Sequence, residues 1–209
     1  MAEYRLYCFA ESGNAYKAAL TLELCGFEWQ ARKVDFFGGE TRTPEYRQAV
    51  NEMGEVPVLE HGDRRLTQSG VILDYLSQQA GRFRGESEEE RREIWRWILF
   101  DNHKLTSYLG TLRFLLRFAK TGETPVTEFL RGRVQGALQI VEGHLAGREY
   151  MVGGRATIAD LSMCGYLYFG DELGLDLTVY PHLQSWLGRI AALPGWKHSY
   201  DLMPRAFGG

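Results

Sequence analysis

The sequence of 209 residues contains only three cysteines, Cys8, Cys25 and Cys164, and no two of them form a Cys-x-x-Cys pair. Cysteines this few and this widely spaced argue against a disulfide scaffold, a zinc ribbon and a dithiol redox motif. The pattern favours a reduced compartment. We therefore expect a cytoplasmic protein that binds no metal and no other cofactor.

The chain also lacks a basic excess and a long apolar run. Its net charge is −3 at pH 7, from 24 Lys and Arg against 27 Asp and Glu, so nothing favours a nucleic-acid partner. No apolar run approaches the roughly 18 residues of a membrane span. No basic stretch followed by an apolar core marks a secretion signal at the N-terminus. We expect neither a nucleic-acid nor a membrane partner.

The first part of the sequence alternates short strands with helices. The patterns predict strands over residues 4–9, 29–35, 56–60 and 65–67, and helices over residues 14–25 and 69–79. Residues 36–50 are predicted to be irregular. The order βαβ, irregular segment, ββα predicts an α/β domain with a mixed sheet over residues 1–77.

The remainder of the sequence is predicted to be helical. Residues 78–86 have two glycines and little apolar content, which is typical of a linker. Helix starts follow at Ser87, where Glu90 completes a capping box, at Thr124, and at Thr157, and a last helix covers residues 181–193. The fold class is therefore α/β plus all-α, with a helical bundle over residues 87–209.

Two positions point to a bound peptide and its charges. Pro57 stands between two valines where a strand is expected, and a strand interior does not tolerate proline. A cis Val56–Pro57 bond would leave the N–H and C=O of Val56 free to pair with an extended peptide ligand. Gln68 and Ser69 open a helix, whose free N–H groups favour an anion.

Ser12 lies between the first strand and the first helix. Ligands of α/β sheets bind at the carboxyl ends of strands, and the start of a helix carries partial positive charge. Ser12 could donate a hydrogen bond to a bound anion, or it could only cap the helix. No Gly-x-Ser-x-Gly elbow and no matching His-Asp pair support a nucleophilic serine.

Four segments together resemble the cytosolic glutathione S-transferase family: residues 12–17, 54–59, 68–69 and 152–160. The resemblance implies a thioredoxin-like N-terminal domain, a helical C-terminal domain, a homodimer, and glutathione as co-substrate. It is closest to the serine-type, zeta- or theta-like form, with a Ser-Gly-Asn motif that places Ser12 as the activator of the glutathione thiol. The residues that match the glutathione site are Arg42, Val56, Pro57, Gln68 and Ser69.

The sequence departs from this pattern at several positions. Gly13 and Asn14 replace the serine and cysteine of the zeta form, which argues against that form's isomerase activity. Glu55 stands where a glutamine or lysine often contacts glutathione, and a carboxylate there would repel the glycine carboxylate, so Glu55 is left out of the site. Tyr7 is the alternative activator, because tyrosine-type members place a phenol on the first strand.

The resemblance implies that the helical domain supplies a pocket for a small, hydrophobic electrophile, with Tyr108 and Leu112 as candidates for its lining. The predicted function is therefore a glutathione transferase. Two alternatives remain open: a non-catalytic glutathione-binding or regulatory protein on the same fold, and a specialised glutathione-dependent isomerase or lyase. Thr157 and Asp160 are predicted to cap a helix and to have a structural role only.

Overall fold

A computed structural model describes residues 3–207 of the chain. By contacts the chain forms two compact units. The first unit combines two stretches of the chain, the residues up to Arg82 and the residues from Leu193 onward. The second unit is Phe83–Ala192. The segment after Leu193 thus groups with the first unit, although the sequence pattern places it in the helical domain. The domain boundaries 1–77, 78–86 and 87–209 stay a prediction.

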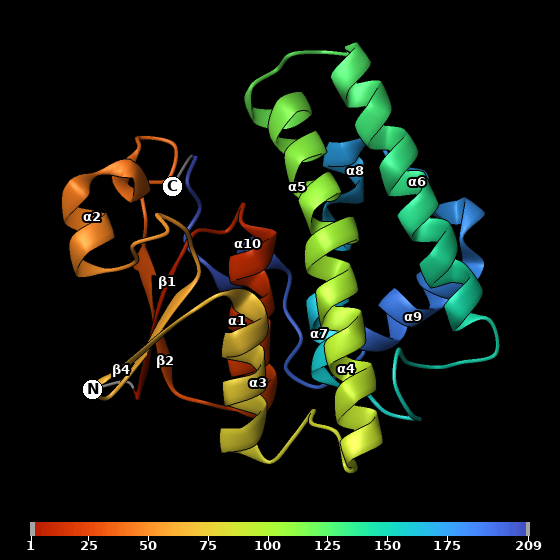
Figure 1. The fold of residues 1–209 in the computed structure, drawn as a ribbon, viewed down its shortest axis with the longest axis horizontal. Coiled ribbons are helices and arrows are strands. Elements are labelled where there is room, and N and C mark those ends of the chain that lie inside the picture. The colour runs from red at the N-terminus through yellow and green to blue at the C-terminus, as the bar shows by residue number, and fades with distance from the viewer. Residues whose placement is uncertain (1–2, 208–209) are drawn as a thin grey trace. The chain divides into compact units, whose positions relative to one another are not determined.

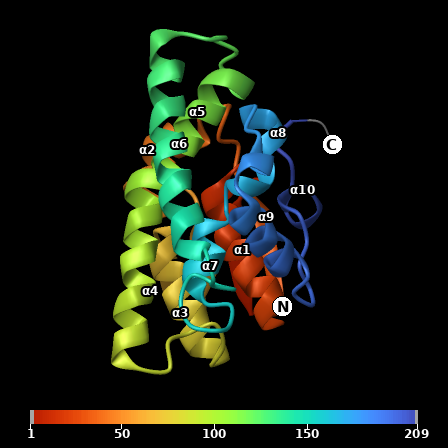
Figure 2. The ribbon, with the colours of Figure 1, turned by 90° about the vertical axis from the view of Figure 1, so that its right-hand side faces the viewer.

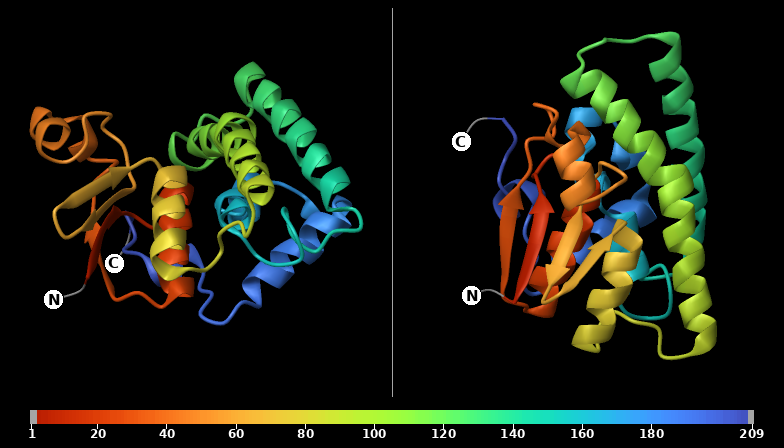
Figure 3. Two further views of the ribbon diagram at one scale, coloured as in Figure 1. Left: turned by 60° about the horizontal axis from the view of Figure 1, so that its bottom comes forward. Right: turned by 60° about the vertical axis from the view of Figure 1, so that its left-hand side comes forward.

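The first unit contains the expected mixed sheet. Its strands are β1 (Tyr4–Cys8), β2 (Trp29–Lys33), β3 (Val58–His61) and β4 (Arg64–Thr67), in the order β2-β1-β3-β4. β1 pairs parallel to β2 and antiparallel to β3, and β3 pairs antiparallel to β4. The strands lie side by side in the right-hand view of Figure 3. This is the thioredoxin-like arrangement that the sequence predicted.

Two helices, α1 (Gly13–Cys25) and α3 (Ser69–Ala80), pack together beside the sheet (Figure 1). Each ends at a glycine in the left-handed conformation, Gly26 at φ 74° and Gly81 at φ 63°, which is the usual C-terminal stop. The buried residues Tyr4, Leu6 and Cys8 alternate with exposed or half-buried ones along β1, so one face of the strand lies in the core.

Residues 36–50 are not wholly irregular, contrary to the prediction. They contain a 3₁₀ turn over Glu40–Arg42 and the helix α2 (Pro44–Ala49). Thr43 caps α2, because its side chain accepts a hydrogen bond from the N–H of Tyr46 at 3.1 Å. A capping threonine followed by proline is a start signal that the sequence carried. The helix has only six residues and too few apolar positions to show a period.

The second unit is helical, as predicted. Its helices are α4 (Glu88–Phe100), α5 (Thr106–Arg113), α6 (Pro125–Leu145), α7 (Ile158–Met163), α8 (Gly170–Leu173) and α9 (Pro181–Ala191). π-helical turns over Asp101–Leu105 and Phe114–Phe118 continue α4 and α5, so that the chain from residue 88 to 118 winds without a break. Figure 2 shows α4 and α6 as the long helices of this unit.

The predicted capping box at the start of α4 is only half present. Ser87 accepts a hydrogen bond from the N–H of Glu90 at 3.1 Å. Glu90 does not reach back to Ser87. It accepts instead from the N–H of Glu86 at 2.8 Å and pairs with Arg155 at 2.7 Å.

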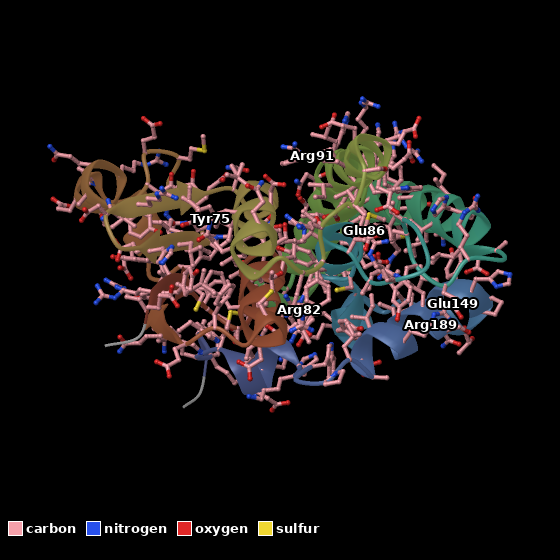
Figure 4. The ribbon with its side chains drawn as sticks, turned by 90° about the horizontal axis from the view of Figure 1, so that it is seen from below. Tyr75, Arg82, Glu86, Arg91, Glu149 and Arg189 are labelled. Atoms are coloured by element: carbon pink, nitrogen blue, oxygen red, sulfur yellow. The ribbon has the colours of Figure 1, made fainter. Side chains whose placement is uncertain are left out.

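Elsewhere in this unit, Arg189 of α9 donates to the carbonyl of Glu149 at 2.9 Å (Figure 4).

The start of α7 carries the capping box that the sequence predicted, with Asp160 at its centre. One carboxylate oxygen of Asp160 accepts from the N–H of Thr157 at 2.8 Å, and the other accepts from Met151 N–H and Trp186 Nε1, both at 2.8 Å. The Thr157 hydroxyl also donates to Asp160, at 3.0 Å. Asp160 is fully buried, and burial raises its pKa while these four hydrogen bonds oppose the rise. No contact suggests a chemical role for this carboxylate.

Candidate functional site

Ser12 lies in the loop between β1 and α1, and it caps the helix. Its Oγ accepts from the N–H of Ala15 at 3.1 Å, and its own N–H donates to the carbonyl of Phe9 at 3.0 Å. The side chain is only 7% exposed. Its hydroxyl proton has no acceptor among residues 3–207. A hydroxyl accepts and donates at once, so the capping and donating interpretations of Ser12 are compatible.

The loop before Pro57 is held by side chains that the sequence reading did not single out. Tyr46 Oη and Asn51 Nδ2 both donate to the carbonyl of Glu55, at 3.1 and 3.0 Å. Gly54 has φ 68°, and a Cβ there would lie 2.7 Å from the carbonyl oxygen of Thr41. The position therefore requires glycine. A buried asparagine next to a glycine turn is a weak signal that could have identified Asn51.

Val56 offers an unpaired backbone, as expected. The Val56–Pro57 bond is cis, which confirms the prediction. Val56 is half-buried, and neither its N–H nor its C=O bonds to another residue that the structure describes. The registers of the sheet pair Tyr7 with Val58 and Val58 with Thr67. Val56 lies two residues before β3 begins, at the end of the sheet where β1 and β4 finish.

The start of α3 completes this group of residues. Gln68 has φ 66°, and its Nε2 donates to Glu55 Oε2 and lies near Met53 Sδ, each at 3.1 Å. Since a carboxylate only accepts, Gln68 Oε1 is the atom left for a ligand. At the N-cap of α3, the Gln68 side chain makes no capping hydrogen bond to the first turn of the helix. Glu55, left out of the site on sequence grounds, therefore sets the orientation of Gln68.

The start of α3 also lies beside the start of α1. Ser69 is 6% exposed, and its Oγ is 3.5 Å from Asn14 Oδ1, which is a long contact. The structure thus brings Ser12, Val56, Gln68 and Ser69 to one edge of the sheet. The first turns of two helices face the same edge, so partial positive charge collects where the sequence predicted an anionic ligand.

Three other predicted residues, Arg42, Tyr108 and Leu112, make no contact among the described residues that places them with Ser12, Val56, Gln68 and Ser69. Arg42 is exposed on its 3₁₀ turn, and within the described part of the chain no hydrogen bond or ion pair joins it to the other four. Arg47, which the sequence did not suggest, donates to the carbonyl of Glu52 at 3.0 Å, close to the Gly54 turn. On α5, Tyr108 is half-buried whereas Leu112 has no exposed surface.

The Tyr7 hydroxyl already has a hydrogen-bond partner on the sheet. Its hydroxyl donates to Glu60 Oε1 at 3.3 Å, and the Arg32 guanidinium lies 5.5 Å from its ring centre. These residues share the face of the sheet that is opposite to Leu6 and Cys8. Burial raises the pKa of Cys8 to about 12, so its thiol is neutral at physiological pH. The Tyr7 hydroxyl thus has a carboxylate partner on the sheet, and the Cys8 thiol is buried.

Residues 3–207 contain no cluster of three or more His, Cys, Asp or Glu that could hold a metal ion. None of the helices in this range is long and apolar enough to cross a membrane.

Comparison with known proteins gives a consistent result. Residues 2–78 match the model of the glutathione S-transferase N-terminal domain, and residues 105–194 match that of the C-terminal domain. A possible glutathione S-transferase from Rhodopseudomonas palustris has 35% identity and a TM-score of 0.89, covering 95% of this chain and 98% of that one. The probable glutathione S-transferase GSTF2 of Oryza sativa subsp. japonica is 27% identical over 97% of this chain and 98% of its own length.

A further relative has a different role in its name. Elongation factor 1-gamma 1 of Oryza sativa subsp. japonica is 28% identical over 92% of this chain, and the match spans 47% of its own length. The two domain models and the 35% identity place the chain without ambiguity. It belongs to the glutathione S-transferase family. Its function is that of a glutathione transferase, an enzyme class that uses glutathione as co-substrate.

Proposed function

We propose that this glutathione transferase is of the serine type and that Ser12 activates the thiol of glutathione for attack on a small hydrophobic electrophile. The observation that carries the proposal is the Ser12 hydroxyl. It is held by the cap to Ala15, almost fully buried, and free to donate its proton. Ser12 need not ionise, because it only has to bind the thiolate more strongly than the thiol.

The energies are sufficient for such activation. A free thiol has a pKa near 8.5, and each unit of lowering requires about 1.4 kcal/mol. A charge-assisted hydrogen bond supplies about 1.5–3 kcal/mol, and a helix start about 0.3–2 kcal/mol. Ser12 at the start of α1 provides both, so the pKa of the bound thiol should fall by about one to three units.

The same edge of the sheet supplies the contacts for the rest of glutathione. In this proposal the unpaired backbone of Val56, next to Pro57, hydrogen-bonds the cysteinyl part of the peptide. Ser69 and the uncapped turn of α3 bind the γ-glutamyl carboxylate, while Gln68 Oε1 accepts from the γ-glutamyl ammonium. Arg42, exposed on its 3₁₀ turn, is proposed to lie near the glycine carboxylate.

The electrophile and the assembly are proposed on family grounds. Tyr108 is proposed to contact the electrophile, with Leu112, one helical turn later, as the wall behind it. A homodimer is proposed because the resemblance to the family implies one, and a cytoplasmic location fits three cysteines that are all free. Sedimentation at micromolar concentration should give twice the 23.9 kDa of one chain. A single-chain mass would contradict the dimer.

A non-catalytic role is the second candidate, favoured by the match to elongation factor 1-gamma. Such a module would not need the uncommitted Ser12 hydroxyl. The two functions are separated by titrating the thiolate absorbance of glutathione with the protein present. A transferase should show saturable binding and a thiol pKa at least one unit below 8.5. Absence of both the shift and turnover with an aromatic halide would favour the binding module.

A further inference from the structure

We infer that the C-terminal segment, residues 197–206, positions the Ser12 loop for thiol activation, and that Glu11 is the positioning residue through which it acts. The inference rests on the proposed role of Ser12. The segment lies beyond residue 194, where the match to the second family domain ends. It belongs to the same compact unit as the loop.

The segment hydrogen-bonds directly to the two residues before Ser12. Ala10 donates its N–H to the carbonyl of Pro204 at 2.9 Å, and the carbonyl of Ala10 accepts from Ser199 Oγ. Glu11 then accepts, through Oε2, from the N–H of Ala206 at 2.8 Å. Ala10 and Ser199 are fully buried and Glu11 is 5% exposed. The two backbone groups of Ala10 are thus paired with residues 194 and 189 positions away, Pro204 and Ser199.

Both ends of the segment are anchored to the same unit. At its start, the carbonyl of Lys197 accepts from Tyr16 Oη at 2.9 Å, and its ammonium pairs with Glu23 on α1. At its end, the ring of Phe207 packs on Phe37, with ring centres 4.5 Å apart. The helix α10 (Ser199–Leu202) packs against α1 between these anchors. The segment is therefore a strap that crosses the loop rather than a loose tail.

The contacts of Ser12 itself are all local: its N–H donates to Phe9 O, its Oγ accepts from Ala15 N–H, and its carbonyl accepts from Tyr16 N–H. The hydrogen bonds from the C-terminal segment to Ala10 and Glu11 tie this local turn to a distant part of the chain. Hydrogen bonds weaken steeply as the donor angle departs from linear, and displacements of about 1 Å in an active site can cost about 100-fold in rate. Loss of the Glu11 contact would leave the Ser12 cap formed but allow the loop to shift relative to a bound thiol.

A pair of substitutions at Glu11 tests the inference. Glu11→Gln keeps an oxygen that accepts from Ala206, whereas Glu11→Ala removes it. For Glu11→Ala we expect the pKa of glutathione's thiol in the complex to rise by about one unit, and the turnover number at pH 6.5 to fall roughly three- to tenfold. The Michaelis constant for glutathione should change less than threefold. Glu11→Gln should restore both the pKa and turnover, and Asp201→Asn, on the exposed side of the strap, should match the parent.

Three results would overturn the inference. One is a Glu11→Ala variant with a lower melting temperature but an unchanged thiol pKa, since the strap would then only stabilise the fold. Another is a Glu11→Gln variant as impaired as Glu11→Ala, since charge rather than position would then matter. If Glu11→Ala does not fold, Ser199→Ala takes its place with the same expectation, and failure of both to fold also overturns it. A parent protein without a lowered thiol pKa would instead refute the proposed role of Ser12.

Discussion

Two substitutions at Ser12 separate its role as a helix cap from its role as a hydrogen-bond donor. Ser12→Ala removes both the acceptor for Ala15 N–H and the donor. Loss of a cap costs about 1 kcal/mol, which for a chain of this size lowers the melting temperature by roughly 2–4 °C. Ser12→Asp keeps an equally good cap but has no proton to give. It should melt close to the parent and still fail to stabilise a thiolate.

The chemical effect follows from one lost charge-assisted hydrogen bond. Its 1.5–3 kcal/mol corresponds to a rise of about one to two units in the pKa of the bound thiol. Below both pKa values, the thiolate fraction then falls about 10- to 100-fold. A more basic thiolate is also a better nucleophile, with a Brønsted coefficient of about 0.4–0.5, which recovers roughly three- to tenfold. The net loss of turnover near pH 6 should be about three- to tenfold, and it should vanish as pH rises.

The assay is a pH series of two measurements on each variant: thiolate absorbance at saturating glutathione, and turnover with an aromatic halide. Both Ser12 variants should shift the thiol pKa upward, and only Ser12→Ala should lose thermal stability. Tyr7→Phe is the control and should match the parent. An unchanged thiol pKa in Ser12→Ala would refute the reasoning, and loss of activity in Tyr7→Phe alone would assign the protein to the tyrosine type.

Other predictions concern stability, binding and reactivity. Asp160→Ala leaves three buried N–H donors without their acceptor, at about 1–3 kcal/mol each. Even the low end of this range, about 3 kcal/mol in all, should lower the melting temperature by roughly 6–12 °C, with no change in the thiol pKa. A melting temperature equal to that of the parent would contradict this. Ser69→Ala should raise the Michaelis constant for glutathione more than it changes turnover. The control Ser77→Ala, on the same helix, should leave this constant unchanged. A Ser69→Ala variant with the parent's Michaelis constant would remove Ser69 from the site. Burial raises the pKa of Cys8 to about 12 and that of Cys25 to about 11, so both thiols stay neutral at pH 8. Both should therefore resist alkylation by iodoacetamide until the chain unfolds. Rapid labelling of the folded protein would contradict this.

Local signals account for most of what the sequence predicted correctly. Ser12, Thr124 and Thr157 begin helices because a hydroxyl satisfies N–H groups that the first turn leaves unpaired. Gly26 and Gly81 end helices because a left-handed residue costs glycine nothing. Such signals act over three or four residues, so they can be read directly from the chain. The mixed sheet followed from the order of these elements.

The parts that were missed depend on contacts distant in sequence. The helix α2 is too short to show a period, yet Tyr46 on it holds the carbonyl of Glu55. Gln68 was assigned to the ligand without its partner, because nothing in the sequence pairs it with Glu55 thirteen residues earlier. No local sequence signal predicts that residues 197–206 return to the Ser12 loop. Because of this return, the boundaries of the compact units differ from the predicted domain boundaries.

The choice between a serine and a tyrosine activator shows how the two levels combine. Alternation along β1 directs Tyr7 to the face where Glu60 accepts a hydrogen bond from its hydroxyl, away from the side of Leu6. A donor already bound to a carboxylate would have to give up that bond before it served a thiol. Ser12 stands beyond the end of the strand, where alternation no longer applies and the helix cap sets its direction. Its proton has no acceptor within the described part of the chain, so the sheet geometry and the hydrogen-bond pattern both favour the serine.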